Sequence, residues 1–181
     1  MDDTLLSIIG IVLAAIIMFL FPLITMADRA DDVSQLTVKI ATSEFAKEVI
    51  ETGKITSNDY NKLQTTLGST GNNYDIEIEA KILDKNPSIQ SIGANGTSSS
   101  QNVTENVYYS IFTSQILDTI NNNNNDNGIF YLKEGDIILI NVKNSSLTMA
   151  QQLKNVFYKV FGKSTYIIAA SGGGMVTVTG K

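Results

Sequence analysis

Five carboxylates beyond residue 70 are the side chains whose type best suits acid–base chemistry: Asp75, Glu77, Glu79, Glu134 and Asp136. A pair of carboxylates can serve as general acid and general base without histidine. The first three alternate with apolar residues, which predicts that they face solvent from a strand. None of the five lies in a pattern that predicts burial or a raised pKa. We therefore expect no catalytic residues and no small-molecule substrate.

The residue types that the chain lacks exclude several other classes of chemistry. It contains no cysteine and no histidine, which removes Ser–His and Cys–His pairs, disulfides and the usual transition-metal ligands. Nucleophile-elbow and Ser-x-x-Lys motifs are missing as well. The net charge of −5 and a pI near 4.6 provide no basic patch for phosphate. We expect no cofactor and no nucleic-acid partner.

One stretch has the spacing of a calcium loop. Asn123-x-Asn125-x-Asn127-Gly128-x₅-Glu134 overlays an EF-hand loop, with glycine at the sixth place and glutamate at the twelfth. An EF-hand loop starts with aspartate, however, and three neutral asparagines leave little negative charge to balance a divalent ion. The sequence that follows has strand character rather than helix character. We interpret this stretch as a polar turn and predict no metal site.

The run Ser171-Gly-Gly-Gly suggests a phosphate-binding loop at first sight. Such a loop places its glycines between a strand and the N-terminus of a helix, often followed by Lys-Ser or Lys-Thr. Here residues 166–170 and 175–179 both have strand character. The pattern therefore predicts a tight turn between two strands.

An uncharged apolar stretch over residues 4–27 organises the whole chain. As a helix rising about 1.5 Å per residue it would extend about 36 Å, more than the ~30 Å hydrocarbon core of a bilayer. No Lys or Arg precedes this stretch, and it is longer than the apolar region of a signal peptide. We predict that it stays in the mature protein. Arg29 and Lys39, the nearby basic residues, fix no orientation in the membrane.

The helical pattern continues beyond this stretch. Residues 28–52 contain no proline or glycine, and Gly53 stands where a residue that ends a helix is expected. We predict one helix over residues 4–52 with Pro22 as the place for a kink; two helices joined near Ala27 are the alternative. The apolar residues of its second half recur at three- and four-residue steps: Val33, Leu36, Ile40, Ala41, Phe45, Val49 and Ile50.

The middle of the chain alternates helix and strand signals. Thr56 or Ser57 is expected to cap a short helix that carries Tyr60, Leu63 and Leu67 on one side and ends at Gly68 or Gly71. Residues 74–83 alternate apolar and polar side chains and predict a strand. Residues 86–106 read as a loop. Residues 107–120 have features of both helix and strand, and we favour helix.

The C-terminal third reads as strand, turn, strand, helix and strand. Residues 129–132 and 136–142 flank a Lys-Glu-Gly turn, which predicts a hairpin. Ser145 or Ser146 is expected to cap a helix from residue 147 or 148 to Phe161. Its predicted inner face consists of Met149, Leu153, Val156, Phe157, Val160 and Phe161.

These elements predict an α+β protein in which a long helix precedes a small head with a mainly antiparallel sheet. We divide it into a membrane-spanning or filament-core helix (residues 1–27), an amphipathic continuation (28–53) and a globular head (54–181). The sequence IIGIVLAAIIMFLFP, residues 8–22, resembles the N-terminal segment of type IV pilins and pseudopilins, which typically reads IIGILAAIAIP. Leu5 departs from that family, which carries an acidic residue there, and residues 1–7 do not contain the basic leader that pilins carry.

The resemblance implies a non-enzymatic structural subunit of a type IV pilus-like surface filament. In that family the N-terminal helix anchors the subunit in the membrane and later packs against its neighbours in the filament. The implied partners are membrane lipid and further copies of the chain, and the implied localisation is a single-pass membrane protein at the cell surface. The residues implied in helix packing are Leu5, Ile9, Gly10, Leu13, Ala14, Ala15, Ile17, Phe21 and Pro22.

A second likeness supports an alternative. The segment GDIILINVKNSS, the helix after it and SGGGMV are similar to TadE-like envelope proteins of Gram-positive bacteria. That likeness implies a membrane-anchored accessory subunit of a secretion or conjugation apparatus. A third interpretation is an anchored adhesive module that uses the Asn- and Ser-rich residues 86–106 and 121–128. A hydrolytic ectodomain ranks last.

Overall fold

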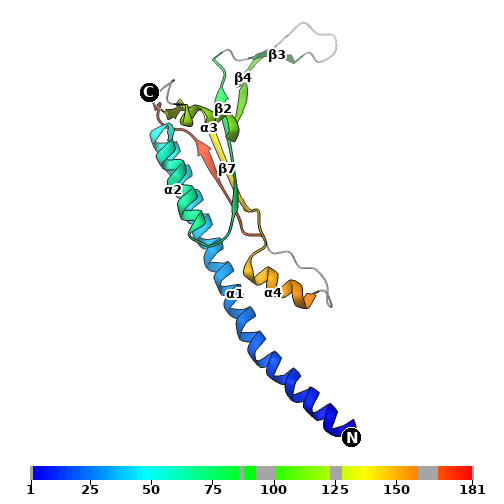
Figure 1. Cartoon of the computed structure of the whole chain (residues 1–181). Coiled ribbons are helices and arrows are strands. Elements are labelled where there is room, and N and C mark those ends of the chain that lie inside the picture. The colour runs from blue at the N-terminus through cyan, green and yellow to red at the C-terminus, as the bar shows by residue number, and fades with distance from the viewer. Residues whose placement is uncertain (1, 86–87, 93–100, 123–127, 159–166, 181) are drawn as a thin grey trace.

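The computed structural model of the chain describes residues 2–85, 88–92, 101–122, 128–158 and 167–180. A long N-terminal helix carries a small head of helices and antiparallel strands on its C-terminal half, while its N-terminal half projects alone (Figure 1). This arrangement confirms the predicted α+β class.

The elements follow one another in the order α1 (Asp2–Thr52), β1 (Lys54–Thr56), α2 (Ser57–Gly68), β2 (Tyr74–Leu83), β3 (Ser88–Ile92), β4 (Gln101–Glu105), β5 (Tyr108–Phe112), α3 (Thr113–Asn121), β6 (Ile129–Tyr131), β7 (Ile137–Asn144), α4 (Met149–Tyr158) and β8 (Ala169–Met175). Within the described residues, the main sheet has the order β5-β2-β7-β8, and two-stranded ribbons join β1 to β6 and β3 to β4.

Helix α1 is continuous, as predicted, and Pro22 lies inside it without ending it. The few polar side chains of its apolar half bond within the helix: the Ser7 and Thr25 hydroxyls donate to carbonyls one turn back, each at 2.9 Å. Gly53, with φ of 64°, ends the helix and donates its N–H to the Val49 carbonyl. The Ser7 and Thr25 hydroxyls therefore need no partner outside the helix.

The apolar residues of the second half of α1 divide between two faces. Phe45 and Val49 are buried against the head. Val33, Leu36 and Ile40 remain 65%, 58% and 49% exposed, so the single apolar face expected from the sequence is wrong for these three. The head-facing side instead includes small or polar residues that allow close packing: Ser34, Ala41, Thr42 and Ala46.

Strand β2 has the predicted bounds and pairs antiparallel with β7, with Ile78 opposite Ile140. Both strands turn alternate aliphatic side chains toward α1, where they form the core of the head: Ile76, Ile78, Ala80, Ile138, Ile140 and Val142. The short helix α2 also agrees with prediction. Thr56 and Asp59 form a reciprocal capping box, and Leu63 and Leu67 are buried.

The glycine run is not a turn, contrary to prediction. Gly172, Gly173 and Gly174 lie within β8, which pairs with β7, and no strand covers residues 176–179. A Cβ on Gly172 would lie 3.2 Å from the Ala46 Cβ, and one on Gly174 would lie 2.9 Å from the Ile50 side chain. The missing side chains let α1 cross close over this strand.

Residues 86–120 contain more strand than predicted. The expected loop over residues 86–106 includes the antiparallel pair β3 and β4, and the first half of the expected helix over residues 107–120 is β5, an edge strand on β2. The Thr113 hydroxyl accepts from the Ile78 N–H at 2.7 Å and so takes the next ladder position. Helix α3 begins there, which explains the mixed signal in the sequence.

The predicted hairpin between residues 129–132 and 136–142 is also wrong. The turn exists, since the Asp136 N–H donates to the Lys133 carbonyl at 3.0 Å. The flanking strands nevertheless diverge: β6 pairs with β1, whereas β7 lies between β2 and β8. Each strand finds a partner that is distant in sequence, which local turn rules do not reveal.

Helix α4 begins at Met149 with Thr148 as its cap, whereas Ser145 or Ser146 was expected. The Gln151 N–H donates to the Thr148 hydroxyl, and the Gln151 amide oxygen accepts from the Thr148 N–H. The predicted inner face is wrong at its start, because Met149 is 73% exposed whereas Ala150 and Gln151 are buried. The side chains of residues 156–161 on that predicted face lie outside the described part of the structure.

We predict that replacing Gly172 by valine destabilises the head by about 1–3 kcal/mol, because the added atoms force α1 away from β8. Gly68→Ala is the control, since a Cβ there has nothing within 4 Å. Urea unfolding of the detergent-solubilised protein, followed by circular dichroism, measures the difference. Equal midpoints for G172V and G68A would contradict close packing of α1 on β8.

Candidate functional site

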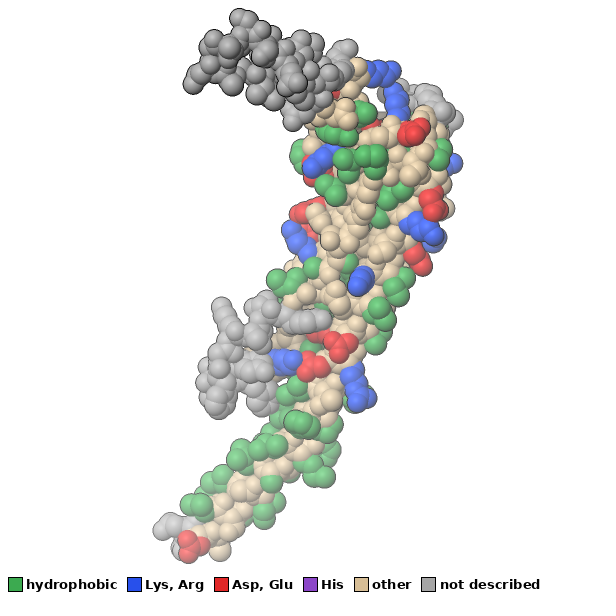
Figure 2. Space-filling view, turned by 180° about the vertical axis from the view of Figure 1, so that it is seen from behind, with side chains coloured by type: hydrophobic (Ala, Val, Ile, Leu, Met, Phe, Trp, Pro, Cys, Tyr) green, Lys and Arg blue, Asp and Glu red, His purple; other side chains and the backbone are tan. Residues whose placement is uncertain are grey.

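The largest uncovered feature is the apolar N-terminal half of α1. All nine residues that the pilin resemblance implied in helix packing lie there and are exposed: Leu5, Ile9, Gly10, Leu13, Ala14, Ala15, Ile17, Phe21 and Pro22. Figure 2 shows hydrophobic side chains around this half and charged side chains where the head begins. Among the described residues, α1 is the helix long and apolar enough to cross a membrane.

The end of the apolar stretch is held to the head by polar contacts with α4. Asp31 is buried, and its carboxylate accepts a 2.6 Å hydrogen bond from the Thr148 hydroxyl, the group that also caps α4. Asp28 forms an ion pair with Lys154 of α4. These contacts place α4 beside the first charged residues that follow the apolar stretch.

One helical turn further along α1, Gln35 binds the start of β8. Its amide donates to the Ala169 carbonyl at 2.6 Å and accepts from the Ala169 N–H at 3.1 Å. The side chain thus satisfies both backbone groups of the strand's first residue, much as another strand would. Gln35 and Asp31 together fix the end of the head nearest the apolar stretch on α1.

The structure does not gather the candidate acid–base residues into one pocket. Asp75 and Glu77 lie exposed on β2 and both pair with Lys143, at 3.8 Å and 2.8 Å. The hydrogen bond from Lys143 to Glu77 raises the lysine pKa, helped by the charges of Glu77 and Asp75. Glu79 accepts from the Ser110 hydroxyl at 2.7 Å. The described geometry gives these groups surface partners and no convergent target.

Asp136 is the carboxylate for which sequence reasoning was wrong about burial: it is 2% exposed. One of its oxygens accepts from the Leu83 N–H at 2.9 Å and the other from the Lys133 N–H at 2.7 Å. Its carbonyl accepts from the Val176 N–H at 2.7 Å. Asp136 thus ties together the ends of three segments of the head, which is a structural role.

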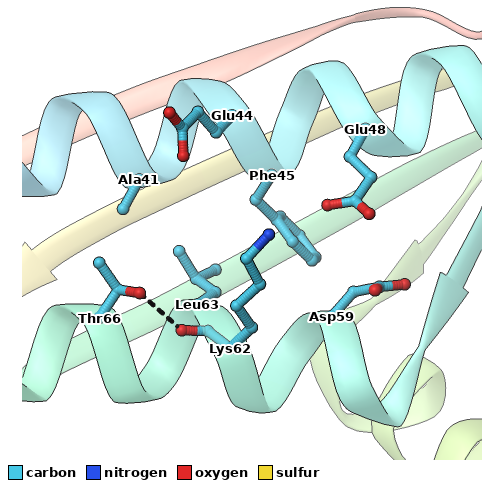
Figure 3. Close-up of a pocket in the computed structure, with 8 residues that line it drawn as sticks. All are labelled: Ala41, Glu44, Phe45, Glu48, Asp59, Lys62, Leu63 and Thr66. Carbon is cyan, nitrogen blue, oxygen red and sulfur yellow. Dashed lines mark hydrogen bonds between the residues drawn. The ribbon is translucent and has the colours of Figure 1, made fainter.

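A groove between α1 and α2 is one candidate for a binding site. Figure 3 shows Glu44 and Glu48 of α1 opposite Asp59 and Lys62 of α2, with Phe45 between them. Its volume of about 30 Å³ suits about one water molecule. Asp59 is engaged in the capping box of α2. The groove is too small for an organic substrate.

The EF-hand-like stretch cannot be assembled from the described residues. Asn123, Asn125 and Asn127 lie outside them, while Glu134 is exposed at the turn before β7. In the described ranges, no group of three or more Asp or Glu side chains is placed to hold a metal ion.

The Tyr60 phenol, near β2, has a raised pKa, caused first by burial and second by the charge of Asp75. This phenol therefore stays neutral at physiological pH.

Sequence reasoning missed the polar residues that fix the head on α1: Asp31, Gln35 and Thr148. The Thr148-x-x-Gln151 spacing is a capping-box signal that could have identified the start of α4. Asp31 and Gln35 carried no local signal, because their partners lie more than 100 residues away in the chain.

Comparisons of this chain with protein-family models, with curated proteins and with solved structures find no match. The resemblance to pilins therefore rests on residues 8–22 and on the layout predicted from the sequence, and no comparison supports it.

We predict that Asp136→Ala destabilises the head by about 1–3 kcal/mol, because the backbone N–H groups of Leu83 and Lys133 lose their carboxylate acceptor. The matched control is Glu134→Ala, which truncates an exposed carboxylate two residues away. Thermal unfolding of both variants measures the difference. The structural role assigned to Asp136 is wrong if D136A and E134A unfold at the same temperature.

Proposed function

We propose that this protein is a non-enzymatic structural subunit of a type IV pilus-like surface filament, anchored in the membrane by α1 before assembly. The observation that carries the proposal is the uncovered apolar surface of α1. Its N-terminal half buries no side chain against the head, so lipid or other protein must cover it in the cell.

The exposed apolar residues beyond the membrane favour assembly over simple anchoring. Ile40 lies thirteen residues after Ala27, roughly 20 Å further along the helix, where lipid does not reach. Val33, Leu36 and Ile40 nevertheless stay exposed, spaced three and four residues apart on one side of α1. A neighbouring subunit packed along α1 would bury this stripe together with the membrane half.

Small residues in the apolar half support the same interpretation. Gly10 and Ala14 stand four residues apart, and a Cβ on Gly10 would have nothing within 4 Å. Small residues at that spacing let two helices approach closely in lipid or in a filament. The same apolar surface suits lipid first and neighbouring helices later, because the two environments are chemically alike.

The alternative function is a membrane-anchored accessory subunit of a secretion or conjugation apparatus that does not polymerise. Mechanical shearing of cells that express the protein separates the two. The filament proposal expects fibres in the sheared fraction with this chain as their main component, visible by electron microscopy. Retention in the membrane fraction after shearing, with a monomer in detergent, would favour the accessory subunit.

We predict that the double variant Leu36→Glu/Ile40→Glu lowers the yield of fibres about tenfold or more, since burying unpaired carboxylates costs over ~1.4 kcal/mol. Membrane fractionation should stay unchanged, because both residues lie outside the apolar stretch. Asn61→Glu/Gln64→Glu is the charge-matched control on the exposed side of α2. Quantitative immunoblots of sheared and membrane fractions measure both effects, and normal fibres from L36E/I40E would refute packing along this stripe.

A further inference from the structure

We propose that α4 is an interfacial helix whose exposed apolar side lies against the surface of the bilayer that α1 crosses. The inference rests on the proposed membrane anchoring of α1. It adds a second contact between the protein and lipid, made by the head rather than by the spanning helix.

The contacts of α4 fix its level along α1. Lys154 pairs with Asp28, the first charged residue after the apolar stretch, and Thr148 binds Asp31 less than one turn further on. Thr148 and Lys154 stand about 9 Å apart along the axis of α4. Their partners on α1, Asp31 and Asp28, stand only about 4.5 Å apart along the axis of α1. Helix α4 therefore runs obliquely away from α1 and stays level with the end of the apolar stretch (Figure 1).

The sides of α4 differ in what they face. Ala150, Gln151 and Lys154 form the side toward α1; the first two are buried and Lys154 makes the ion pair. Met149 is 73% exposed. Successive helix positions turn by about 100°, so Met149 lies on the other side of the helix from the centre of these three residues. Leu147, just before the helix, is 52% exposed. These apolar side chains face away from the head.

A third side of α4 is polar. Gln152 and Asn155 are exposed and stand about 60° apart around the helix axis. A docked side, an apolar side and a polar side on one short helix match an element that lies at a membrane interface. The apolar side there enters the boundary between head groups and acyl chains, and the polar side faces water.

The level of α4 along α1 favours lipid as the partner of its apolar side. Asp28 and Asp31, at the end of the apolar stretch, are the acidic residues of α1 that make contacts with α4. Lys154 pairs with Asp28, the Thr148 hydroxyl binds Asp31, and Asp32 beside them is exposed to solvent. The apolar stripe with Val33, Leu36 and Ile40 lies mostly farther along α1 and is the surface assigned above to a second copy.

Site-directed spin labelling tests this inference, since the chain has no cysteine of its own. Three single variants of the full chain, Met149→Cys, Asn155→Cys and Met18→Cys, are labelled and reconstituted into phosphatidylcholine–phosphatidylglycerol vesicles. Met149 and Asn155 are both exposed positions of α4, which makes them a matched pair. The accessibility of each label to oxygen and to a water-soluble nickel complex reports its depth.

We expect the Met18 label to be accessible to oxygen and shielded from nickel, as in the hydrocarbon core. The Met149 label should be several-fold less accessible to nickel than the Asn155 label, at a depth near the head groups. If Met149 and Asn155 labels react equally with nickel while Met18 stays shielded, the interfacial helix is refuted and the anchor stands. A Met18 label open to nickel refutes the anchor itself. A Met149 label shielded from both reagents indicates a protein neighbour and also overturns the proposal.

Discussion

The backbone hydrogen bonds within α1 are the interaction on which the rest of the structure depends. A helix satisfies its own N–H and C=O groups, so one element can extend from a lipid environment into water without exposing unpaired groups to lipid. The Ser7 and Thr25 hydroxyls follow the same rule by bonding to carbonyls of their own helix. Because α1 is continuous through Pro22, its apolar half and the part that packs against the head form one helix.

The head is attached to this helix by two different kinds of contact. Toward the C-terminal end of α1 the attachment is apolar and close, with Phe45 and Val49 buried and Gly172 and Gly174 of β8 leaving room for the helix. Nearer the apolar stretch it is polar, through Asp28, Asp31 and Gln35, whose partners come from α4 and β8. The attachment of the head therefore changes from apolar to polar along α1, in the direction of the apolar stretch.

Four of the five carboxylates that first suggested chemistry, all but Glu134, have identified partners in the described part of the head. Asp136 holds two backbone N–H groups, Asp59 caps α2, and Asp75 and Glu77 pair with Lys143 across the sheet. Large apolar side chains are exposed mainly along α1, with others at the start of α4 and on strands of the head. The proposed assembly subunit rests on this exposed apolar surface of α1.

The sequence by itself determined the elements whose signals are local: the continuous α1, the capped α2 and the alternating β2 all appear where the pattern placed them. Periodicity and capping act over a few residues, so they are readable without a fold. Only the tertiary structure decided which side of α1 is buried. It also decided that β6 pairs with β1 rather than with β7, and that the glycines of β8 lie in a strand. It decided as well that Asp31 and Asp136 are buried, because burial of a polar group depends on finding partners, and Thr148 and Leu83, which bind these carboxylates, lie far away in the chain.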